Sequence, residues 1–441
     1  MVQTTGRNIG FHAQIDRLWT VLIEPRVQLF QLGGRECLDC QLAFLYLGRT
    51  HSACSAYQCA FSLTTTHQCC YPISMPLVPD YIASLRPYEA GRQAADVARA
   101  YGLSRVVKLA SNENPLGPSP AALEAIRDNV AHLNIYPDGG LALRQTLARE
   151  YDTRVENVIA GSGSEAIISN IIRTFLCDDD EILTTEAAFI GFQLLAKSRG
   201  AHYRTVPLTS DYAYDLEAIA RAITPRTKII YLANPNNPTG TFFSKQQFDA
   251  FYRHVPERVL IMLDEAYFEY AKDNPRYPDS MDYRYDNVIT LRTFSKVYGL
   301  AGVRIGYGFA HEELIANLLK VKLPFEPGTL AQAAGIAALH DRAFFHRSLE
   351  ANARGVAILR RTLTEQKIRF IESQANFVMT VWPSEEEARH VTQALLEQGV
   401  IVRPLTSWGL PRCVRITVGT EDEMLFLAVA LRNAVAAEMV L

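Results

Sequence analysis

Reactive side chains follow three successive apolar runs of this sequence, at the points where the runs end. A lysine amine can bond covalently to an aldehyde, while a carboxylate, an amide and a phenol can hold a polar ring beside it. Taken singly, each residue is more often a turn, a helix cap or a core side chain, so only the set indicates chemistry. The set is Asn237, Asp264 with Tyr267, and Ser295 with Lys296.

The elements that must position these residues are short β-rich runs separated by helical segments. This alternation predicts an α/β fold with a mostly parallel central sheet flanked by helices. The carboxyl ends of parallel strands meet at one edge, where ligands bind, so the reactive residues are expected to lie together. The runs are residues 180–185, 202–206, 228–233, 259–263 and 288–291, and the helical segments are 187–199, 215–222 and 244–254.

A small-residue loop, Gly161–Ser164, lies between a strand-like run at 157–160 and an apolar helix at 166–176. A loop of this kind aims free N–H groups and the helix dipole at an anion. The spacing matches neither the dinucleotide fingerprint nor the Walker loop. The sequence therefore predicts a phosphate cradle of unspecified type, and a tight turn that needs glycine explains the loop equally well.

Composition excludes several classes of function. The chain has 441 residues, enough for two or three domains, and a net charge of −3, which does not indicate nucleic acid or an anionic membrane surface as a partner. No apolar run reaches the roughly 18 residues that span a bilayer. Of eight cysteines, six precede Met75. The remaining body therefore has no disulfide framework, which indicates a reducing compartment such as the cytoplasm.

The first 74 residues have a different composition, without a single lysine. The segment Cys37–Cys40 could ligate zinc, but no second pair follows at matching spacing, so no metal site is expected. An arginine-containing, acid-poor terminus could also be a targeting segment. We interpret residues 1–74 as an extension without a part in the chemistry, and we expect the functional start at Met75.

The C-terminal part reads as a smaller α+β domain. Long helices at about 329–339 and 341–366 precede four strands and two further helices. The predicted organisation is an arm at 75–107 that joins the small domain, a large domain at 108–327 and the small domain at 328–441. Arg415 lies on one of these strands among apolar neighbours, where a cation needs an anion: a bound ligand or a structural ion pair.

Pyridoxal phosphate has the aldehyde that a reactive lysine requires, and the other residues meet its further demands. Asp264 can keep the pyridine nitrogen protonated, and Asn237 and Tyr267 can bond the ring hydroxyl. Phe189 can stack on the ring. The loop at 161–164, with Ser295 and Arg304, can hold the phosphate.

With these motifs in place, the chain resembles fold-type I pyridoxal-phosphate aminotransferases of classes I and II, most closely the histidinol-phosphate aminotransferases. The resemblance covers about residues 76–437. It is carried by Leu109–Pro115, Tyr136–Asp138, Asn234–Gly240, Asp264–Tyr267, Ser295 and Lys296 with Arg304, and Arg403 with Arg415.

The resemblance implies a role for each matching residue. Lys296 holds the cofactor and shuttles the proton, with Asp264 and Tyr267 as its catalytic partners. Arg415 grips the glutamate carboxylate and, with Arg403 and Tyr88, the phosphate of histidinol phosphate; Asn112 is a further substrate-binding residue. Tyr136 reaches the cofactor phosphate of the partner subunit, which implies a homodimer with shared sites. The cofactor contacts are Ser162, Gly163, Ser164, Phe189, Asn237, Asp264, Tyr267, Ser295, Lys296 and Arg304.

The expected activity is transfer of an amino group between glutamate and imidazole acetol phosphate, by a ping-pong cycle in histidine synthesis. An aromatic or broad-specificity aminotransferase and a threonine-phosphate decarboxylase-like lyase are the alternatives. Two departures from the family bear on the site. Glu165-Ala166 stands where the family often has two acidic residues, and Phe189 stands where it often has tyrosine.

Overall fold

The computed structural model describes residues 77–87, 91–283 and 286–438. All of them belong to the second of the two units into which the chain divides, residues 74–441. The predictions for residues 1–74, for a start at Met75 and for Tyr88 lie outside the described residues.

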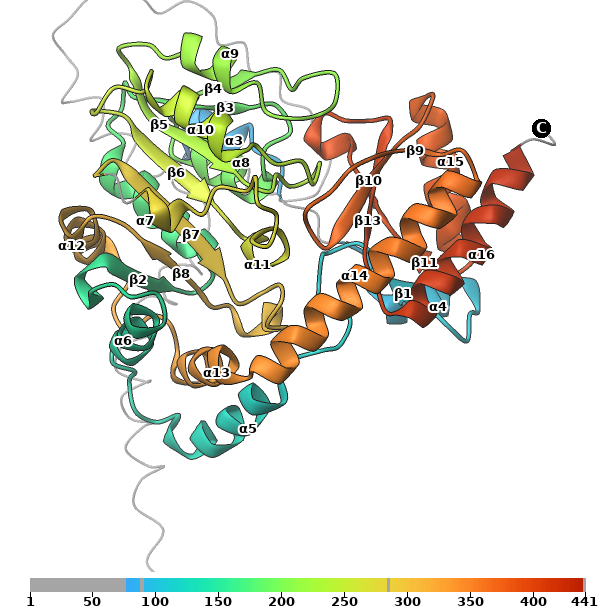
Figure 1. Ribbon diagram of the computed structural model, residues 1–441, viewed down its shortest axis with the longest axis horizontal. Helices are drawn as coiled ribbons and strands as arrows, with labels where there is room; N and C mark the ends of the chain where they lie inside the picture. The colour runs from blue at the N-terminus through green and yellow to red at the C-terminus, as the bar shows by residue number, and fades with distance from the viewer. Residues whose placement is uncertain (1–76, 88–90, 284–285, 439–441) are drawn as a thin grey trace, which may run out of the picture. The chain divides into compact units, whose positions relative to one another are not determined.

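The larger sheet has seven strands among the described residues, and the pairing is parallel from β7 to the edge strand β4 (Figure 1). β7, β6, β5, β3 and β4 pair in parallel, whereas β8 runs antiparallel to both β7 and β2. The order is β2 (Val158–Gly161), β8 (Gly306–Phe309), β7 (Val288–Thr293), β6 (Leu260–Asp264), β5 (Thr227–Ala233), β3 (Glu181–Thr185) and β4 (His202–Val206).

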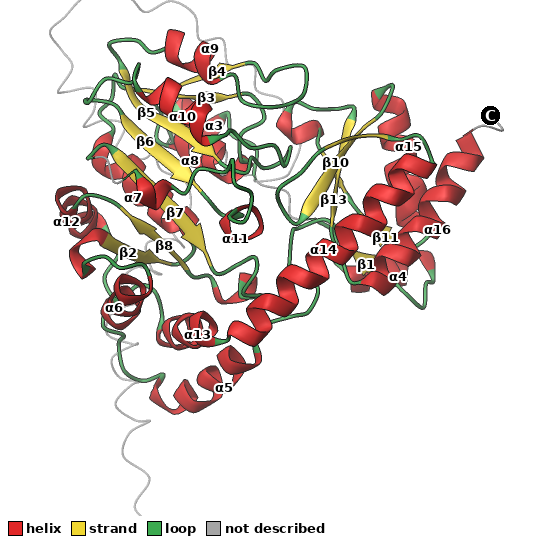
Figure 2. Cartoon of the chain, viewed as in Figure 1, coloured by secondary structure: helices red, strands yellow, loops and turns green. Residues whose placement is uncertain are grey.

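Helices cover both faces of this sheet, as Figure 2 shows. Successive residues of β5 belong to different cores: Ile229 packs with the residues of α7 and α8, and Ile230 packs with those of α9 and α10. Because neighbouring residues of a strand point to opposite faces, a strand buried on both sides must be apolar throughout. The covering helices are α7 (Ser164–Phe175), α8 (Ile190–Ser198) and α12 (Glu312–Val321) on one face, and α9 (Leu216–Arg221) and α10 (Lys245–Tyr252) on the other.

Helices that precede and follow the sheet in sequence pack with its antiparallel end. Leu143 of α6, Ala122 of α5 and Ala334 of α13 share one core with Tyr307 of β8. Other elements outside the large sheet are short, namely α3, α11, β1 and several 3₁₀ turns. Bounds are α3 (Asp80–Ala83), α4 (Ala94–Tyr101), α5 (Pro120–Asn129), α6 (Leu141–Glu150), α11 (Phe268–Ala271) and α13 (Thr329–His340).

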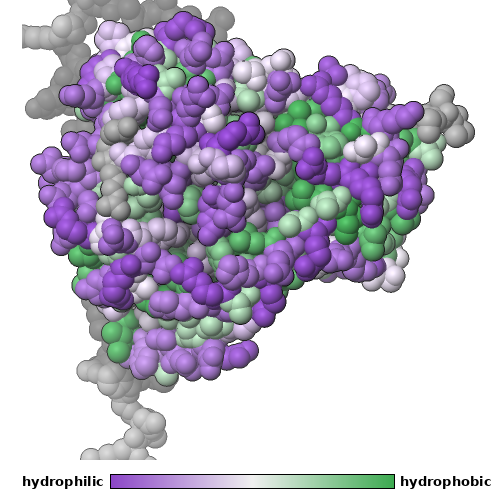
Figure 3. Space-filling view, viewed as in Figure 1, coloured by the Kyte–Doolittle hydropathy of each residue, from purple (hydrophilic) through white to green (hydrophobic). Residues whose placement is uncertain are grey.

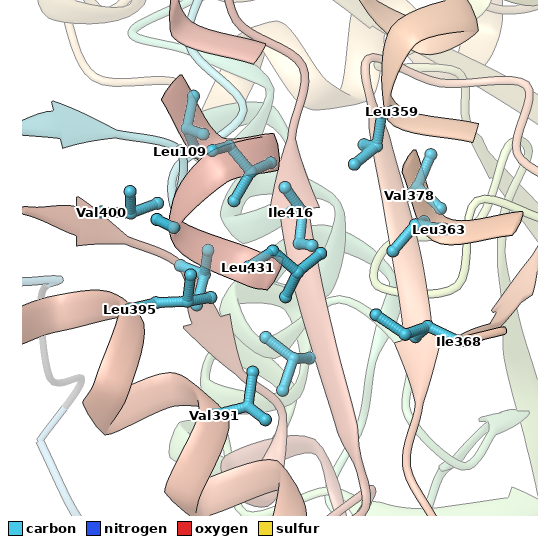
Figure 4. Packing of buried hydrophobic residues seen from close by; sticks show 14 of the residues in the cluster. Leu109, Leu359, Leu363, Ile368, Val378, Val391, Leu395, Val400, Ile416 and Leu431 are labelled. Atoms are coloured by element: carbon cyan, nitrogen blue, oxygen red, sulfur yellow. The ribbon is translucent and has the colours of Figure 1, made fainter. Parts of the chain in front are cut away.

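A second, antiparallel sheet lies in the C-terminal part, in the order β12-β13-β10-β9. Its residues pack against three helices in one apolar core, part of which Figure 4 shows around Ile416 and Leu431. β1 (Val107–Lys108) pairs in parallel with β11 (Val400–Ile401), beside which it lies in Figure 1. Bounds are β9 (Arg369–Ile371), β10 (Phe377–Val381), β12 (Arg403–Pro404), β13 (Cys413–Thr417), α14 (Arg342–Glu365), α15 (Glu385–Glu397) and α16 (Glu421–Glu438).

One helix contributes to the cores of both sheets. Phe345, near the start of α14, packs in the core of the antiparallel end of the large sheet, whereas Leu359 and Leu363 pack in the core of the small sheet. The predicted mostly parallel sheet with flanking helices is confirmed. The apolar pattern does not predict β8 or α12, because two of the four β8 residues are glycines and the α12 segment carries two acidic residues at its start.

Hydrophilic residues cover most of the face seen in Figure 3, with smaller apolar patches between them. Among the described residues, no helix combines the length and the apolar character that a membrane crossing needs.

Candidate active site

A cavity of about 210 Å³ opens where β5, β6 and β7 end. Parallel strands bring their carboxyl ends to one edge, so residues from distant parts of the sequence meet there. The cavity is lined by eight of the residues that the sequence predicts for the cofactor site: Ser164, Phe189, Asn237, Asp264, Tyr267, Ser295, Lys296 and Arg304.

Asp264 ends β6 and is almost fully buried. Its Oδ2 accepts a hydrogen bond from the Tyr231 hydroxyl at 2.7 Å, and its Oδ1 accepts one from the Ala266 N–H at 3.2 Å. Burial raises the pKa of the Asp264 carboxyl, although Tyr231, the Ala266 N–H and Lys296 act in the opposite direction. A buried carboxylate in this state gains from a positively charged partner in the cavity.

Tyr267 and Asn237 line the cavity, and hydrogen bonds from residues outside its lining hold their polar atoms. The Tyr267 hydroxyl accepts a hydrogen bond from Asn112 Nδ2 at 2.8 Å. Asn237 Oδ1 accepts one from Arg415 Nη1, and Arg415 Nη2 donates to the Ala110 carbonyl at 2.8 Å. These bonds connect the small sheet to the cavity through one amide.

The loop before α7 and the Arg304 guanidinium form a concave, cationic end of the cavity. Gly163 has a φ of +85°, and a Cβ on it would lie 2.8 Å from Arg304 Nη2. Gly163 is the N-cap residue of α7 and provides no side-chain cap, which leaves helix N–H groups open to an anion. Arg304 itself lies in the left-handed region, at φ 58°, a strained conformation typical of functional sites.

Glu165 currently pairs with Arg304, Oε2 to Nη2 at 3.0 Å. Both side chains are roughly half exposed, so water screens the pair and its contribution to stability is small. The guanidinium is therefore available to a stronger anion that enters the cavity.

Lys296 follows β7 in a tight turn and is half-buried. The Thr293 hydroxyl fixes the turn, since it accepts from the Ser295 N–H at 3.1 Å and donates to Ser295 Oγ at 3.0 Å. Lys296 Nζ lies 5.4 Å from the centre of the Tyr267 ring. The amine thus faces the same space as the phenol.

Several predicted residues do not line this cavity. Ser162 donates its N–H to Glu326 Oε1 at 3.1 Å. Tyr136 is 77% exposed and stacks on Phe325, with ring centres 4.3 Å apart. Arg403 lines a separate cavity of about 1030 Å³. Gly163, Asn112 and Arg415 stand directly behind lining residues.

Arg403 and Arg415 nevertheless lie next to each other. They face each other in the antiparallel register of β12 and β13. Both guanidiniums lie near the Trp408 ring, at 5.3 and 5.7 Å from its centre. Two neighbouring guanidiniums beside one aromatic ring can bind carboxylate and phosphate groups.

The cavity also contains residues that the sequence patterns do not identify. Tyr231 lies inside an apolar strand run, where it reads as a core residue. Glu165 reads as a first-turn helix acid. The other polar members are Ser111, Glu113 and Thr293. Of these residues, Ser111 and Glu113 lie in the segment Leu109–Pro115, which carries part of the family resemblance.

A buried ion cluster lies beside the cavity, starting from the residue after Asp264. Glu265 Oε2 pairs with Arg292 Nη2 at 2.8 Å, and the same nitrogen lies 2.8 Å from Asp279 Oδ1. The Arg292 side chain is 0% exposed, and its guanidinium lies 3.3 Å from the centre of the Phe268 ring. Burial raises the pKa of Glu265 to about 7, against the influence of Arg292.

The residues present fit pyridoxal phosphate. The cavity offers a lysine amine, a buried carboxylate whose described hydrogen bonds come from a phenol and a backbone N–H, an amide and a phenol, and a cationic cradle with open helix N–H groups. These are the groups that an aldehyde, a pyridine nitrogen, a ring hydroxyl and a phosphate require.

Comparison with known proteins gives one consistent family. The family described as aminotransferase class I and II matches residues 104–431. A histidinol-phosphate aminotransferase of Anaeromyxobacter sp. (strain Fw109-5) is 42% identical over 352 residues, 79% of this chain and 96% of that protein. Histidinol-phosphate aminotransferase 2 of Ralstonia nicotianae is 41% identical over 370 residues, 82% of this chain and 98% of that protein.

Solved structures agree with the sequence relatives. The crystal structure of histidinol-phosphate aminotransferase from Sinorhizobium meliloti, in complex with pyridoxal-5'-phosphate, has a TM-score of 0.74 at 29% identity. The similarity covers 83% of this chain and 99% of that one.

Proposed function

The chain belongs to aminotransferase class I and II, and from this premise we propose that it exchanges an amino group between glutamate and imidazole acetol phosphate with pyridoxal phosphate as cofactor. The product is histidinol phosphate, in the direction that histidine synthesis needs. The relatives named as histidinol-phosphate aminotransferases cover most of this chain at about 40% identity and support this choice of substrate. The cofactor follows from the family and from the pyridoxal-phosphate complex of the Sinorhizobium meliloti enzyme.

One observation carries the proposal: Lys296, Asp264, Asn237, Tyr267 and Arg304 line a single cavity. Pyridoxal phosphate bound there supplies an aldehyde and an aromatic ring that takes up the electron pair released at the substrate α-carbon. A binding protein for a phosphate ester would need the cationic end of this cavity but would not need the lysine, or the carboxylate at the position of Asp264.

The chain's own residues divide the work of the reaction. Lys296 would hold the cofactor through its aldehyde and, as a free amine, would carry the proton between the substrate α-carbon and the cofactor. Asp264 keeps the ring nitrogen protonated. Asn237 and Tyr267 orient the ring hydroxyl, and Phe189 stacks on the ring face. These assignments rest on the lining of the cavity and on the family resemblance.

Arg304, Ser295 and the loop at 162–164 hold the phosphate in this proposal. The cradle is positive because of the guanidinium and the start of α7. The φ of +85° at Gly163 supports a glycine requirement there. Arg304 exchanges its exposed partner Glu165 for the phosphate.

Arg403, Arg415 and Asn112 bind the substrates in this proposal. Arg415 binds the α-carboxylate of glutamate, because it already donates to Asn237 at the cavity wall. Arg403, 5.3 Å from the Trp408 ring centre, binds the phosphate of the second substrate with Tyr88. Phe189 lacks the hydroxyl that relatives often carry, so it contributes ring stacking only.

Steady-state kinetics with purified protein and pyridoxal phosphate tests the substrate. Parallel double-reciprocal lines for histidinol phosphate and 2-oxoglutarate are expected, as for a ping-pong cycle. Fast turnover of phenylalanine with none of histidinol phosphate would instead identify an aromatic aminotransferase. Release of CO₂ from phosphothreonine would identify a lyase.

We propose further that the active form is a homodimer with shared sites. Large apolar side chains are exposed on two neighbouring segments, joined by the Tyr136–Phe325 stack and by the bond from Lys322 Nζ to the Gly139 carbonyl at 3.0 Å. Such a surface is typical of a protein interface. Its exposed members are Leu123, Val130, Leu133, Ile135, Tyr136, Leu141, Leu319, Leu323 and Phe325.

Subunit complementation tests this arrangement. If Tyr136 serves the partner subunit's site, Tyr136→Ala and Lys296→Ala proteins are each defective at low cofactor concentration. Unfolding and refolding them together should restore about a quarter of the wild-type activity, because half the dimers are mixed and each holds one intact site. No recovery in mixed dimers verified by mass would contradict sharing.

We assign the enzyme to the cytoplasm. Its two cysteines in the described residues, Cys177 and Cys413, are unpaired, as expected in a reducing compartment. Fractionation of the source cells followed by immunodetection tests the assignment, and recovery in a secreted or membrane fraction would contradict it.

A further inference from the structure

Tyr231 lies in the middle of a buried strand, yet its hydroxyl group reaches the reaction cavity. The residue is 0% exposed, lies on β5 and is one of the residues that line the cavity. Its hydroxyl donates to Asp264 Oδ2 at 2.7 Å. Among the described hydrogen bonds, it is the side-chain donor to the carboxylate that is proposed to hold the cofactor ring.

Packing fixes the Tyr231 ring on both the strand and the helix side. The ring stacks on Phe192 of α8 with 3.7 Å between centres and 9° between planes. The Thr184 hydroxyl donates to the Tyr231 carbonyl at 2.8 Å. In the parallel register Tyr231 faces Met262, so the phenol reaches two residues along β6 to Asp264. The donor position is set by the core and does not depend on a flexible side chain.

The direction of the hydrogen bond is also fixed. Burial, with the charge of Asp264, raises the pKa of Tyr231 well above its ordinary value, so the phenol keeps its proton and donates. Charged and titratable groups that act on Asp264 are Tyr231 and Tyr214, Lys296 after β7 and Glu165 from α7. An ionised carboxylate offers about four lone-pair directions. Tyr231 and the Ala266 N–H use two, and the others remain for a ligand.

We infer that Tyr231 is a positioning residue of this enzyme, whose hydroxyl keeps the Asp264 carboxylate ionised and oriented to receive the protonated ring nitrogen of the cofactor. The inference rests on the function proposed above. Without the hydroxyl, a carboxylate in so buried a place takes up a proton more readily. A protonated Asp264 must release that proton before it can pair with a protonated ring, and cofactor binding weakens.

The test is Tyr231→Phe, which keeps the ring and its stack on Phe192. Apo-protein is titrated with pyridoxal phosphate between pH 6 and pH 9, and the dissociation constant is read from the absorbance of the bound cofactor. A hydrogen bond to a buried charge predicts a dissociation constant roughly tenfold or more higher at neutral pH. The fall in affinity on acidification should begin at a higher pH than in the wild type.

A second buried phenol provides the matched control. Tyr307 is also 0% exposed, and its hydroxyl bonds only to the Tyr151 hydroxyl, at 2.9 Å, among the bonds that the structure describes. Tyr307→Phe loses one buried hydrogen bond without touching Asp264. Its pH profile of cofactor binding should match the wild type even if its melting temperature falls.

A double substitution separates positioning from packing. With Asp264→Asn in place, adding Tyr231→Phe should change the dissociation constant less than twofold, because the charge that the hydroxyl supports is gone. Equal losses in both backgrounds, or an unchanged affinity and pH profile of Tyr231→Phe alone, would overturn the inference. A wild-type protein that binds no pyridoxal phosphate would instead refute the proposed function.

Discussion

Two neighbouring carboxylates, Asp264 and Glu265, have opposite surroundings. Glu265 is paired with the buried guanidinium of Arg292 at 2.8 Å. Asp264 is equally buried, but its hydrogen bonds come from a phenol and an N–H, and it faces a cavity. The charge of Glu265 is thus paired within the protein, whereas the carboxylate of Asp264 faces the cavity.

The difference shows how a site differs from a structural cluster of the same residue types. A buried charge is costly unless it is paired. At Glu265 the pair is internal, so its loss affects folding. At Asp264 we propose that the pairing cation is the protonated ring of the cofactor, so the cost of burying the carboxylate is offset when the cofactor binds. Substitutions on the two sides should therefore separate chemistry from stability.

Lys296→Ala on the cavity side should have the largest effect. Loss of the covalent anchor and of the proton carrier is expected to lower kcat by at least about 10⁴-fold. The visible absorbance of the lysine-bound cofactor should disappear as well. Lys320→Ala, an exposed lysine on α12, is the control and should leave both unchanged. Retained absorbance and turnover in Lys296→Ala would refute the assignment.

Asp264→Asn should rank second and lower kcat on the order of 10³-fold, because the ring nitrogen loses its counter-charge. The apo-protein, by contrast, should be as stable as the wild type or more stable, since a buried carboxyl with a raised pKa is replaced by a neutral group. Stopped-flow kinetics and urea denaturation of the apo-protein measure the two effects. A destabilised apo-protein with normal kcat would mean that Asp264 serves stability and not the reaction.

Arg292→Met, in the ion cluster with Glu265, should lower stability and leave cofactor binding intact. Removal of one partner leaves Glu265 buried and uncompensated, which is expected to cost about 3–5 kcal/mol of unfolding free energy. The surviving folded protein should still bind cofactor.

The control is Arg361→Met, at an exposed pair with Glu365 on α14. Exposed helix pairs contribute only about 0.3–0.5 kcal/mol. Guanidinium denaturation with matched m-values measures both variants. Equal losses in the two would mean that the buried cluster contributes no more than a surface pair.

Glu269→Gln should have the smallest of these effects, a change in the free energy of unfolding that depends on pH. Burial raises its pKa to about 7 from 4.5. The stability that its protonated form contributes is complete below pH 4.5 and is lost as pH rises through about 7. Glu269→Gln should therefore gain about 1–3 kcal/mol relative to the wild type between pH 5 and pH 8. Denaturation at both pH values checks this, and a constant difference would contradict a raised pKa.

Local sequence patterns predict most helices and strands within a few residues, because apolar periodicity and caps are local. α14 shows this, since a predicted helix at about 341–366 is observed at Arg342–Glu365. β8 escapes prediction because glycines interrupt its apolar run.

The same rule explains which site residues the sequence reveals. Asn237, Asp264 and Lys296 end parallel strands, and that topology alone brings them to one edge. Tyr231 carries no such signal: a tyrosine inside an apolar run looks the same whether its hydroxyl meets an active-site carboxylate or another core group.

The sequence by itself therefore determined the fold class and the cofactor chemistry, and it predicted the reactive set, because residue types and the alternation of strands and helices are local features. Only the tertiary structure decided how the charges are held. It joins Tyr231 to Asp264 by a hydrogen bond and Arg292 to Glu265 by an ion pair. It also joins Arg415 to Asn237, which are 178 residues apart in the sequence. Such contacts depend on register and on packing between distant segments, and no local pattern encodes them.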